Sequence, residues 1–275
     1  ASVEDVDTAF DSAVAAQPGW DQRGGRARGA ILRAMGDAME ADMDRLLAIM
    51  AVEAGKTLAD GIAEVREAVD FCRYYAAQAE REFDSAVRLP GPAGETNHLG
   101  MKGRGVFVTI SPWNFPLAIF IGTPAAALAA GNTVVAKPAE QTPLIAALAV
   151  RLCHEAGIPE EAFQLLPGAG EVGEMITSDP RIAGVAFTGS TQTAQAINRS
   201  LASRDGPIAT LIAETGGQNA MIVDSTALPE QVTRDDKVRE GYCGTSLRAA
   251  QPAREQTTPP AESRLPERNI GGGDC

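Results

Sequence analysis

The sequence has few of the residues that build metal centres and disulfide frameworks. Its 275 residues include four cysteines, spaced far apart and without a CxxC pair, and two histidines, His98 and His154. A zinc site needs a closely spaced set of such ligands, and a disulfide framework needs a regular series of cysteines. We therefore expect no metal site and no disulfide framework, so that any special cysteine would work as a thiol.

Basic residues and long apolar runs are also scarce. Lys and Arg total 24 against 36 Asp and Glu, and no basic cluster offers a surface to a phosphate backbone. The longest apolar run lies within residues 115–130 and is too short and too rich in Ala, Gly and Pro to span a bilayer. The first ten residues lack the basic start and apolar segment of a secretion signal. We predict a cytoplasmic protein that binds neither nucleic acid nor membrane.

Hydrophobic residues make up 44% of the chain, which is the share expected of a packed globular protein. In the first part of the chain, apolar residues recur at helical spacing over residues 28–50 and 60–84. This spacing predicts two long amphipathic helices. Residues 89–100 are rich in turn formers and end the section.

Short β-branched and apolar runs then alternate with helical segments. The runs that predict strands are residues 105–110, 132–137, 162–166, 182–190 and 208–214. Strands and helices that alternate at this spacing favour an α/β fold whose parallel sheet is covered by helices on both faces.

The composition predicts three sections. Residues 1–104 form a helical section, and residues 105–232 form the parallel sheet with its helices. From residue 233 onward, charges of both signs are mixed with Pro, Gly and Thr, and large apolar residues are scattered. Because such a segment buries too little surface to offset its ordering entropy, we expect residues 233–275 to be mostly disordered.

Two glycine motifs match phosphate-binding patterns incompletely. Residues 168–173, "GAGEVG", fit G-x-G-x-x-G between a predicted strand and a helix, but the acid expected about 20 residues later is absent. Residues 54–57, "AGKT", resemble the end of a P-loop, but Met50 stands where its first glycine belongs. The second match is discarded, and the first is weak evidence for the usual dinucleotide-binding mode.

Two strand ends carry residues suited to a nucleotide. Ser190 in "AFTGST" opens a helix directly after a buried strand, where free amides and the helix dipole favour a pyrophosphate. On local grounds alone, an ordinary N-cap is the favoured interpretation of Ser190. Lys137 ends another strand with Glu140 just beyond, and such a pair can hold the hydroxyls of a ribose. The alternative is a surface lysine beside an acid.

Two further strand ends carry residues suited to catalysis. Asn114 lies in "SPWNFP", where two prolines clamp a short turn, and an amide held in this way can donate to a developing oxyanion. A purely structural turn is the alternative. Glu214 stands between two apolar runs in "LIAETGGQNAMIV", a setting that would raise the pKa of its carboxyl and suit a general base. A salt-bridged structural acid would also explain it.

Together these motifs closely resemble the aldehyde dehydrogenase superfamily. The likeness is carried by "SPWNFPL", "GNTVVAKPAEQTP", "FTGST" and "ETGGQNAMIVDSTALPEQV", in this order, and covers about residues 1–232. With "EAGKTLADGIAEVREAVDFCRYYAAQA" upstream, the wording is similar to the 1-pyrroline-5-carboxylate (glutamate semialdehyde) dehydrogenase half of bifunctional bacterial proline utilisation proteins. The resemblance implies a variant Rossmann-like fold that binds NAD, an aldehyde substrate, and oligomers among the full-length relatives.

The resemblance also assigns residues. It implies that Asn114 donates to the oxyanion and that Glu214 activates a thiol or water. For the cofactor it implies Ile110, Pro112 and Trp113 beside the nicotinamide, Lys137 and Glu140 at the adenosine ribose, and Gly189 and Ser190 at the pyrophosphate, with Gly170 and Phe187 completing the site.

The family's nucleophilic cysteine belongs to a G-Q-x-C motif, which this sequence lacks. Cys243, in "GYCGTS", lies near the expected place but has no preceding Gln, and Cys72, Cys153 and Cys275 are no better placed. Most of the family's catalytic domain is missing, so we expect an N-terminal fragment with an unrelated or frame-shifted tail.

Two functions follow. The first is NAD-dependent oxidation of glutamate semialdehyde to glutamate in proline catabolism, impaired in this chain by the missing motif. The alternative is a non-catalytic NAD-binding fragment or pseudoenzyme.

Overall fold

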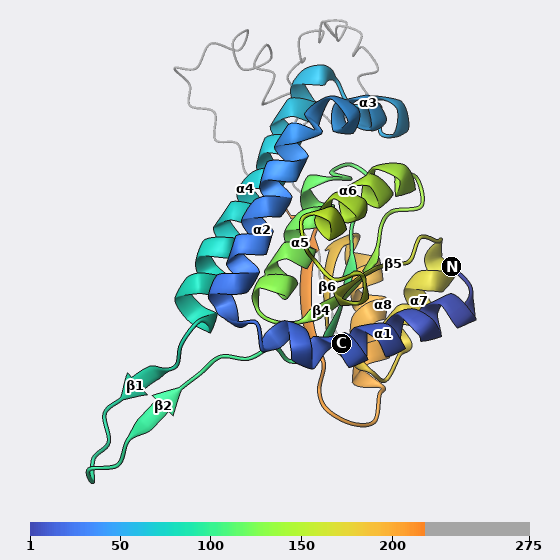
Figure 1. Ribbon diagram of the computed structural model, residues 1–275. Helices are drawn as coiled ribbons and strands as arrows, with labels where there is room; N and C mark the ends of the chain where they lie inside the picture. The colour runs from blue at the N-terminus through green and yellow to red at the C-terminus, as the bar shows by residue number, and fades with distance from the viewer. Residues whose placement is uncertain (218–275) are drawn as a thin grey trace, which may run out of the picture. The chain divides into compact units, whose positions relative to one another are not determined.

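A five-stranded parallel sheet lies at the centre of the structure (Figure 1). The computed structural model describes residues 1–217, so the tail expected from residue 233 and the boundary at residue 232 lie outside the described residues. The strands follow the order β5-β4-β3-β6-β7, and every neighbouring pair is parallel. Their bounds are β3 (Val106–Ile110), β4 (Thr133–Lys137), β5 (Phe163–Leu165), β6 (Ile182–Gly189) and β7 (Thr210–Thr215). The predicted parallel sheet is confirmed.

The central strands are buried on both faces because their apolar residues alternate between two cores. On β3, Val106 and Val108 belong to one apolar cluster, whereas Phe107 belongs to the other. On β4, Val135 faces the first cluster and Val134 the second. Side chains alternate between the faces of a strand, so a continuous β-branched run fills both cores of a covered parallel sheet.

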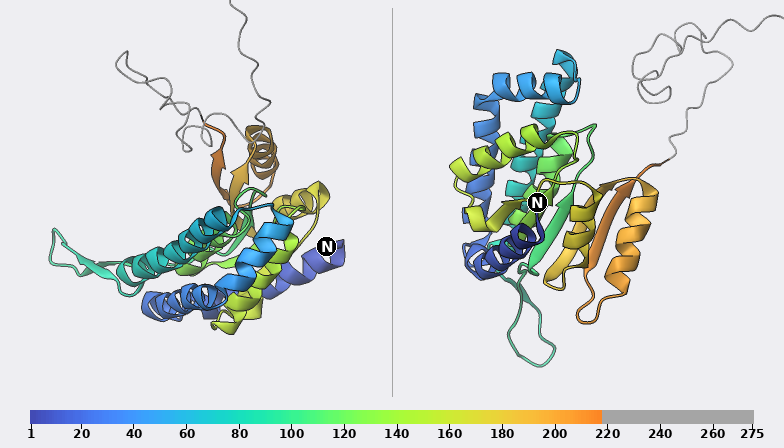
Figure 2. Two further views of the ribbon diagram at one scale, coloured as in Figure 1. Left: turned by 90° about the horizontal axis from the view of Figure 1, so that it is seen from above. Right: turned by 90° about the vertical axis from the view of Figure 1, so that its right-hand side faces the viewer.

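Helices cover both faces of the sheet, as predicted (Figure 2). One core combines α2 (Gly24–Ala41), α3 (Met43–Glu53), α4 (Leu58–Phe83), α5 (Ala118–Ala129) and α6 (Pro143–Glu155). The other combines α1 (Val3–Asp21), α7 (Gly170–Ser178) and α8 (Thr191–Ala202). A single 3₁₀ turn, η1 (Glu160–Ala162), precedes β5.

The single helix predicted over residues 28–50 is wrong in one respect, because it is divided at Asp42. This residue is the C-cap of α2 and the N-cap of α3, with φ −101° and ψ 22°. The apolar spacing continues through the break, so periodicity alone does not reveal it. The turn lets α3 bury Leu46 and Met50 in the core shared with α4 and α6.

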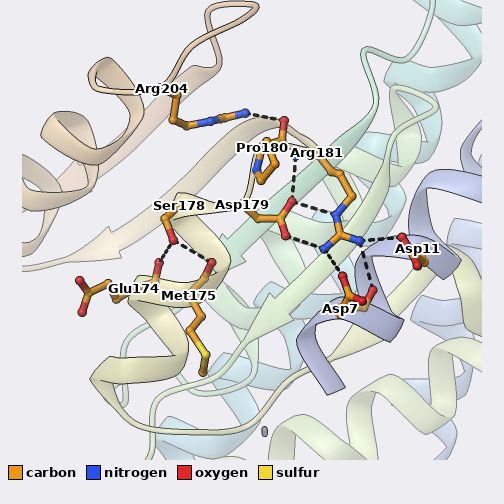
Figure 3. A network of polar contacts seen from close by, with 9 residues as sticks. All are labelled: Asp7, Asp11, Glu174, Met175, Ser178, Asp179, Pro180, Arg181 and Arg204. Atoms are coloured by element: carbon orange, nitrogen blue, oxygen red, sulfur yellow. Dashed lines mark hydrogen bonds and ion pairs between the residues drawn. The ribbon is translucent and has the colours of Figure 1, made fainter. Parts of the chain in front are cut away.

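Helix α1 was not predicted from the sequence, although Ser2 and Asp5 form a capping box at its start. Arg181 joins it to the sheet just before β6 (Figure 3). The guanidinium donates to both carboxylate oxygens of Asp179, at 3.0 and 2.7 Å, and to Asp11 of α1 at 2.6 Å. It also lies 2.8 Å from a carboxylate oxygen of Asp7 and over the ring of buried Phe10. One planar cation therefore ties α1 to the sheet.

The turn-rich segment is a two-stranded antiparallel ribbon. It consists of β1 (Val87–Leu89) and β2 (Asn97–Leu99) and extends away from the sheet (Figure 1). Within residues 1–217, no helix is long and apolar enough to cross a membrane. Over the same residues, no group of three or more His, Cys, Asp or Glu side chains is arranged to hold a metal ion.

Candidate active site

The carboxyl ends of β3, β6 and β7 surround a cavity of about 800 Å³. Parallel strands end at one edge of their sheet, and ligands bind there in open α/β folds. The cavity brings together eight of the predicted site residues: Ile110, Pro112, Trp113, Asn114, Phe187, Gly189, Ser190 and Glu214. Three stretches that are far apart in the sequence therefore share one space.

The loop at residues 111–116 carries Asn114 into this cavity. Trp113, Asn114 and Phe115 are exposed, whereas Pro116 and Ser111 at the ends of the loop are buried. The backbone N–H of Ser111 donates to the carbonyl oxygen of Lys137 at 3.3 Å, which attaches the start of the loop to β4. The amide of Asn114 is thus presented between two fixed ends.

The N-terminus of α8 faces the same cavity. Ser190 is the N-cap, and its Oγ accepts the N–H of Thr193 at 3.2 Å, so the capping interpretation of Ser190 is correct. The first turn of a helix leaves further N–H groups without partners inside the helix, here those of Thr191 and Gln192. Together with the helix dipole, these groups suit an anion such as a pyrophosphate.

A second cavity of about 500 Å³ adjoins the first. Ile110 and Thr193 line both cavities, and Gly170 and Lys137 line the second. Lys137 is buried, and its Nζ donates to the carbonyl oxygen of Pro138 at 3.0 Å. Burial lowers the pKa of the Lys137 ammonium, and the negative charge of Glu140 opposes this effect. Glu140 itself is exposed and lies outside the linings of both cavities.

Glu214 does not have the buried setting expected for it. It lies on β7, opposite Thr188 of β6, and both Glu214 and its neighbours Ile212 and Ala213 are exposed. The reason is that β7 is an edge strand, which pairs with β6 alone among the described residues. The second apolar run expected after Glu214 begins at residue 220, outside the described residues. Glu214 nevertheless lines the first cavity together with Asn114.

Ser111 was not singled out from the sequence, but it carries the clearest mark of a ligand site. It lines the first cavity and is only 6% exposed. Its Oγ has no hydrogen-bond partner within residues 1–217. A buried hydroxyl without a partner costs free energy, so an orphan beside a cavity points to a bound polar group. No sequence signal distinguishes this serine from one in an ordinary turn.

The two described cysteines are poor nucleophiles. Cys72 and Cys153 are both fully buried in the core. Burial raises the pKa of the Cys72 thiol to about 12 and raises that of Cys153 well above its usual range. The thiolate is the reactive form, so neither residue serves the cavity. Cys243 and Cys275 lie outside the described residues.

Comparison with known proteins fits this geometry. Residues 1–235 match the model of the aldehyde dehydrogenase family. The chain belongs to that family. Over 239 residues it is 52% identical to the bifunctional protein PutA of Klebsiella aerogenes, covering 86% of this chain and 17% of that protein.

Solved structures of related proteins have the same fold as this chain. A variant of proline utilization A from Bradyrhizobium japonicum superposes with a TM-score of 0.82 at 56% identity, over 84% of this chain and 24% of that one. A Thermus 1-pyrroline-5-carboxylate dehydrogenase with bound NAD superposes with a TM-score of 0.76 at 34% identity, over 79% and 43%. The family resemblance and the α/β fold are therefore confirmed. The chain spans less than half the length of each of these relatives.

Proposed function

We propose that this chain supplies the cofactor-binding part and two catalytic side chains of an enzyme that oxidises glutamate semialdehyde to glutamate with NAD. The observation that carries the proposal is the shared cavity, in which Asn114, Glu214 and the N-terminus of α8 meet. The names of the relatives, proline utilization A and 1-pyrroline-5-carboxylate dehydrogenase, support this aldehyde as the substrate.

Asn114 is suited to bind the oxygen of a reacting aldehyde. As a nucleophile adds to the carbonyl carbon, negative charge develops on that oxygen, and a fixed amide donor stabilises it. The N–H group of the Asn114 side chain can donate because the loop holds it at the cavity and leaves it exposed. Loss of one such donor typically lowers the rate by about 100- to 1000-fold.

Glu214 is suited to accept a proton. A carboxylate at the wall of the cavity can take a proton from a thiol or from the water that releases the acid product. Its exposed position gives water access to it. This role does not require the buried setting that the sequence suggested.

The two adjoining cavities fit a dinucleotide. Ile110 and Thr193 belong to both linings, so one elongated ligand can reach from Lys137 to Asn114. The start of α8 adjoins both cavities, because Thr193 lines both, and its amides suit the pyrophosphate. The Oγ of Ser111, which has no hydrogen-bond partner within residues 1–217, offers a hydrogen bond in the cavity that Asn114 lines. When bound, NAD supplies the acceptor for the hydride that leaves the substrate carbon.

A non-catalytic NAD-binding fragment is the second candidate. Burial of Cys72 and Cys153 favours it, since the covalent chemistry of the family needs a reactive thiol. Cys243, which lacks the preceding Gln of the family motif, is the remaining candidate near the expected place, and it lies outside the described residues.

Two measurements on the full chain separate the candidates. NAD at 100 times its dissociation constant should stabilise the fold by about 2.7 kcal/mol, which a thermal melt detects. Addition of glutamate semialdehyde should then produce NADH absorbance if the chain is an enzyme. Stabilisation without NADH would support the fragment, and the absence of both would refute both candidates.

Matched variants identify the residues involved. Asn114→Ala and Glu214→Gln should abolish most turnover while NAD still stabilises the fold. Glu161→Gln, at an exposed acid of η1 that lines neither cavity, serves as the control and should turn over normally. Turnover that vanishes in Cys243→Ser would assign the nucleophile, whereas turnover that survives Asn114→Ala would remove Asn114 from the mechanism.

A further inference from the structure

Helix α5 receives its N-terminal cap from a distant residue. The helix follows the Asn114 loop directly, and Leu117 at its start has no side-chain capping bond of its own. Instead, Oε1 of Glu64, on α4, accepts the N–H groups of Leu117 at 2.8 Å and Ala118 at 3.2 Å. Glu64 is only 1% exposed. A carboxylate at this place satisfies two unpaired amides and complements the helix dipole.

Lys56 joins this buried carboxylate to the loop itself. Its Nζ lies 2.9 Å from Oε2 of Glu64, as an ion pair without the angles of a hydrogen bond. The same ammonium lies 4.3 Å above the centre of the Phe115 ring, a cation–π distance. Phe115 is the residue after Asn114. One cation therefore contacts both the cap of α5 and the ring that flanks the proposed oxyanion donor.

Stability alone is a weak explanation for this arrangement. Removing two charges from water costs free energy, and well-packed apolar residues often serve as well as a buried ion pair. Such a pair does impose a particular geometry. Here it acts on residues 115–118, while the other end of the loop is attached to β4 through Ser111. The loop is thus held on both sides of Asn114.

We propose that Lys56 and Glu64 are positioning residues that hold the Asn114 loop in place for catalysis. This rests on the proposed function of Asn114 as the oxyanion donor. It gives a role to "AGKT", the motif that failed as a P-loop: Lys56 fixes the loop, and Thr57 caps α4 by accepting the N–H of Asp60 at 3.2 Å.

The test measures the loop directly, by amide hydrogen exchange of the ligand-free full chain. Lys56→Met removes the ammonium and keeps an apolar stem. We expect the backbone N–H groups within residues 113–118, of which Pro116 has none, to exchange about tenfold faster, equivalent to about 1.4 kcal/mol of local stability. Amides of β4 should not change, Lys56→Arg should restore most of the protection, and the control Lys102→Met, at an exposed lysine, should have no effect.

Glu64→Gln tests the other residue of the ion pair. It removes the negative charge and keeps an oxygen that can accept both N–H groups at the start of α5. It should also speed exchange in residues 113–118. Unchanged exchange there in Lys56→Met would overturn the proposal, as would faster exchange throughout the chain in Lys56→Met that Lys56→Arg does not restore.

Turnover, where the chain shows it, supplies a second readout. A positioning role predicts that Lys56→Met lowers kcat and leaves KM for the aldehyde nearly unchanged. The exchange measurement needs neither NAD nor aldehyde, so the two proposals can fail separately. Faster exchange in Lys56→Met together with no turnover in any variant would contradict the proposed function. Unchanged exchange in Lys56→Met would contradict the positioning role alone.

Discussion

The ring of Phe187 occupies the space that a side chain at Gly189 would need. A Cβ built on Gly189 would lie 2.6 Å from Cζ of Phe187, two residues earlier on β6. Real carbon atoms do not approach so closely without a shift. The glycine therefore leaves room for the ring beside the end of the strand, where both residues line the first cavity.

Gly189→Ala should consequently disturb the cavity. We expect the ring to move, at a cost of about 1–3 kcal/mol for overpacking, and NAD to bind more weakly. Urea denaturation and an NAD titration measure the two effects. Gly170→Ala is the matched control, because Gly170 lines the second cavity but has no atom within 4 Å of an added Cβ. Equal effects of the two substitutions would show that Phe187 is not the cause.

The buried Lys137 predicts a pH dependence of stability. Since burial lowers its pKa, the folded chain binds the proton of Lys137 less tightly than the unfolded chain does. The resulting penalty is full at neutral pH and disappears as the pH rises through the lowered pKa toward the unfolded value of about 10.4. Lys137→Met should therefore stabilise the ligand-free chain near pH 7, on the order of 1–2 kcal/mol, and stabilise it less in alkali.

The same substitution should weaken NAD binding, because the second cavity loses its ammonium. Lys102→Met, at an exposed lysine, should change neither property. Denaturant unfolding at about pH 7 and about pH 10, which is close to the ordinary pKa of a lysine, measures the effect on stability. A stabilisation by Lys137→Met that stays constant with pH would contradict the pKa argument.

The Arg181 cluster predicts an unusually strong surface ion pair. Its guanidinium makes two parallel bonds to Asp179 and a third to Asp11 of α1, and its side chain is 26% exposed. Arg181→Ala should cost about 1–3 kcal/mol, and Arg181→Lys should recover only part of this because an ammonium cannot form the parallel pair.

Arg73 provides the comparison. It also contacts two acids, Asp37 and Glu40, but its side chain is 43% exposed. Exposed pairs contribute about 0–1 kcal/mol, so Arg73→Ala should change the free energy of unfolding by less than Arg181→Ala does. Equal losses of unfolding free energy in Arg181→Ala and Arg73→Ala would mean that the attachment of α1 to the sheet through Arg181 does not add to stability.

Much of the fold could be predicted because its signals are local. Each buried strand is a short β-branched run, such as residues 132–137, and parallel pairing follows from the helices between the runs. The break at Asp42 could not be predicted, since the residues on both sides keep helical spacing and packing against α4 and α6 decides the turn. Helix α1 was missed although Ser2 and Asp5 offered a capping signal.

The site was predictable to a different degree. Strand ends placed Asn114 and Lys137 at one edge of the sheet, because parallel strands end together. The exposure of Glu214 depends on the place of β7 in the sheet order, which its own sequence does not encode. The hydrogen bond between Glu64 and Leu117 joins residues 53 positions apart, and no local sequence pattern predicts such a contact.

The orphan hydroxyl of Ser111 leads to the last prediction, which uses Thr109 as its control. Both hydroxyls are buried without a hydrogen-bond partner within residues 1–217, and Thr109 is 2% exposed. They lie two residues apart, but Ser111 lines the first cavity and Thr109 lines neither cavity. Comparing substitutions at Ser111 and Thr109 therefore distinguishes the free-energy cost of a buried, unsatisfied hydroxyl from a role of that hydroxyl in ligand binding.

Removing either hydroxyl should leave the free energy of unfolding unchanged or raise it, because an unsatisfied buried group costs about 1–3 kcal/mol. NAD binding should respond differently. Ser111→Ala should weaken it by about tenfold, the equivalent of one hydrogen bond of about 1.4 kcal/mol, whereas Thr109→Val should not affect it. A calorimetric NAD titration of the two variants decides the matter, and equal affinities would show that the Ser111 hydroxyl does not contact the cofactor.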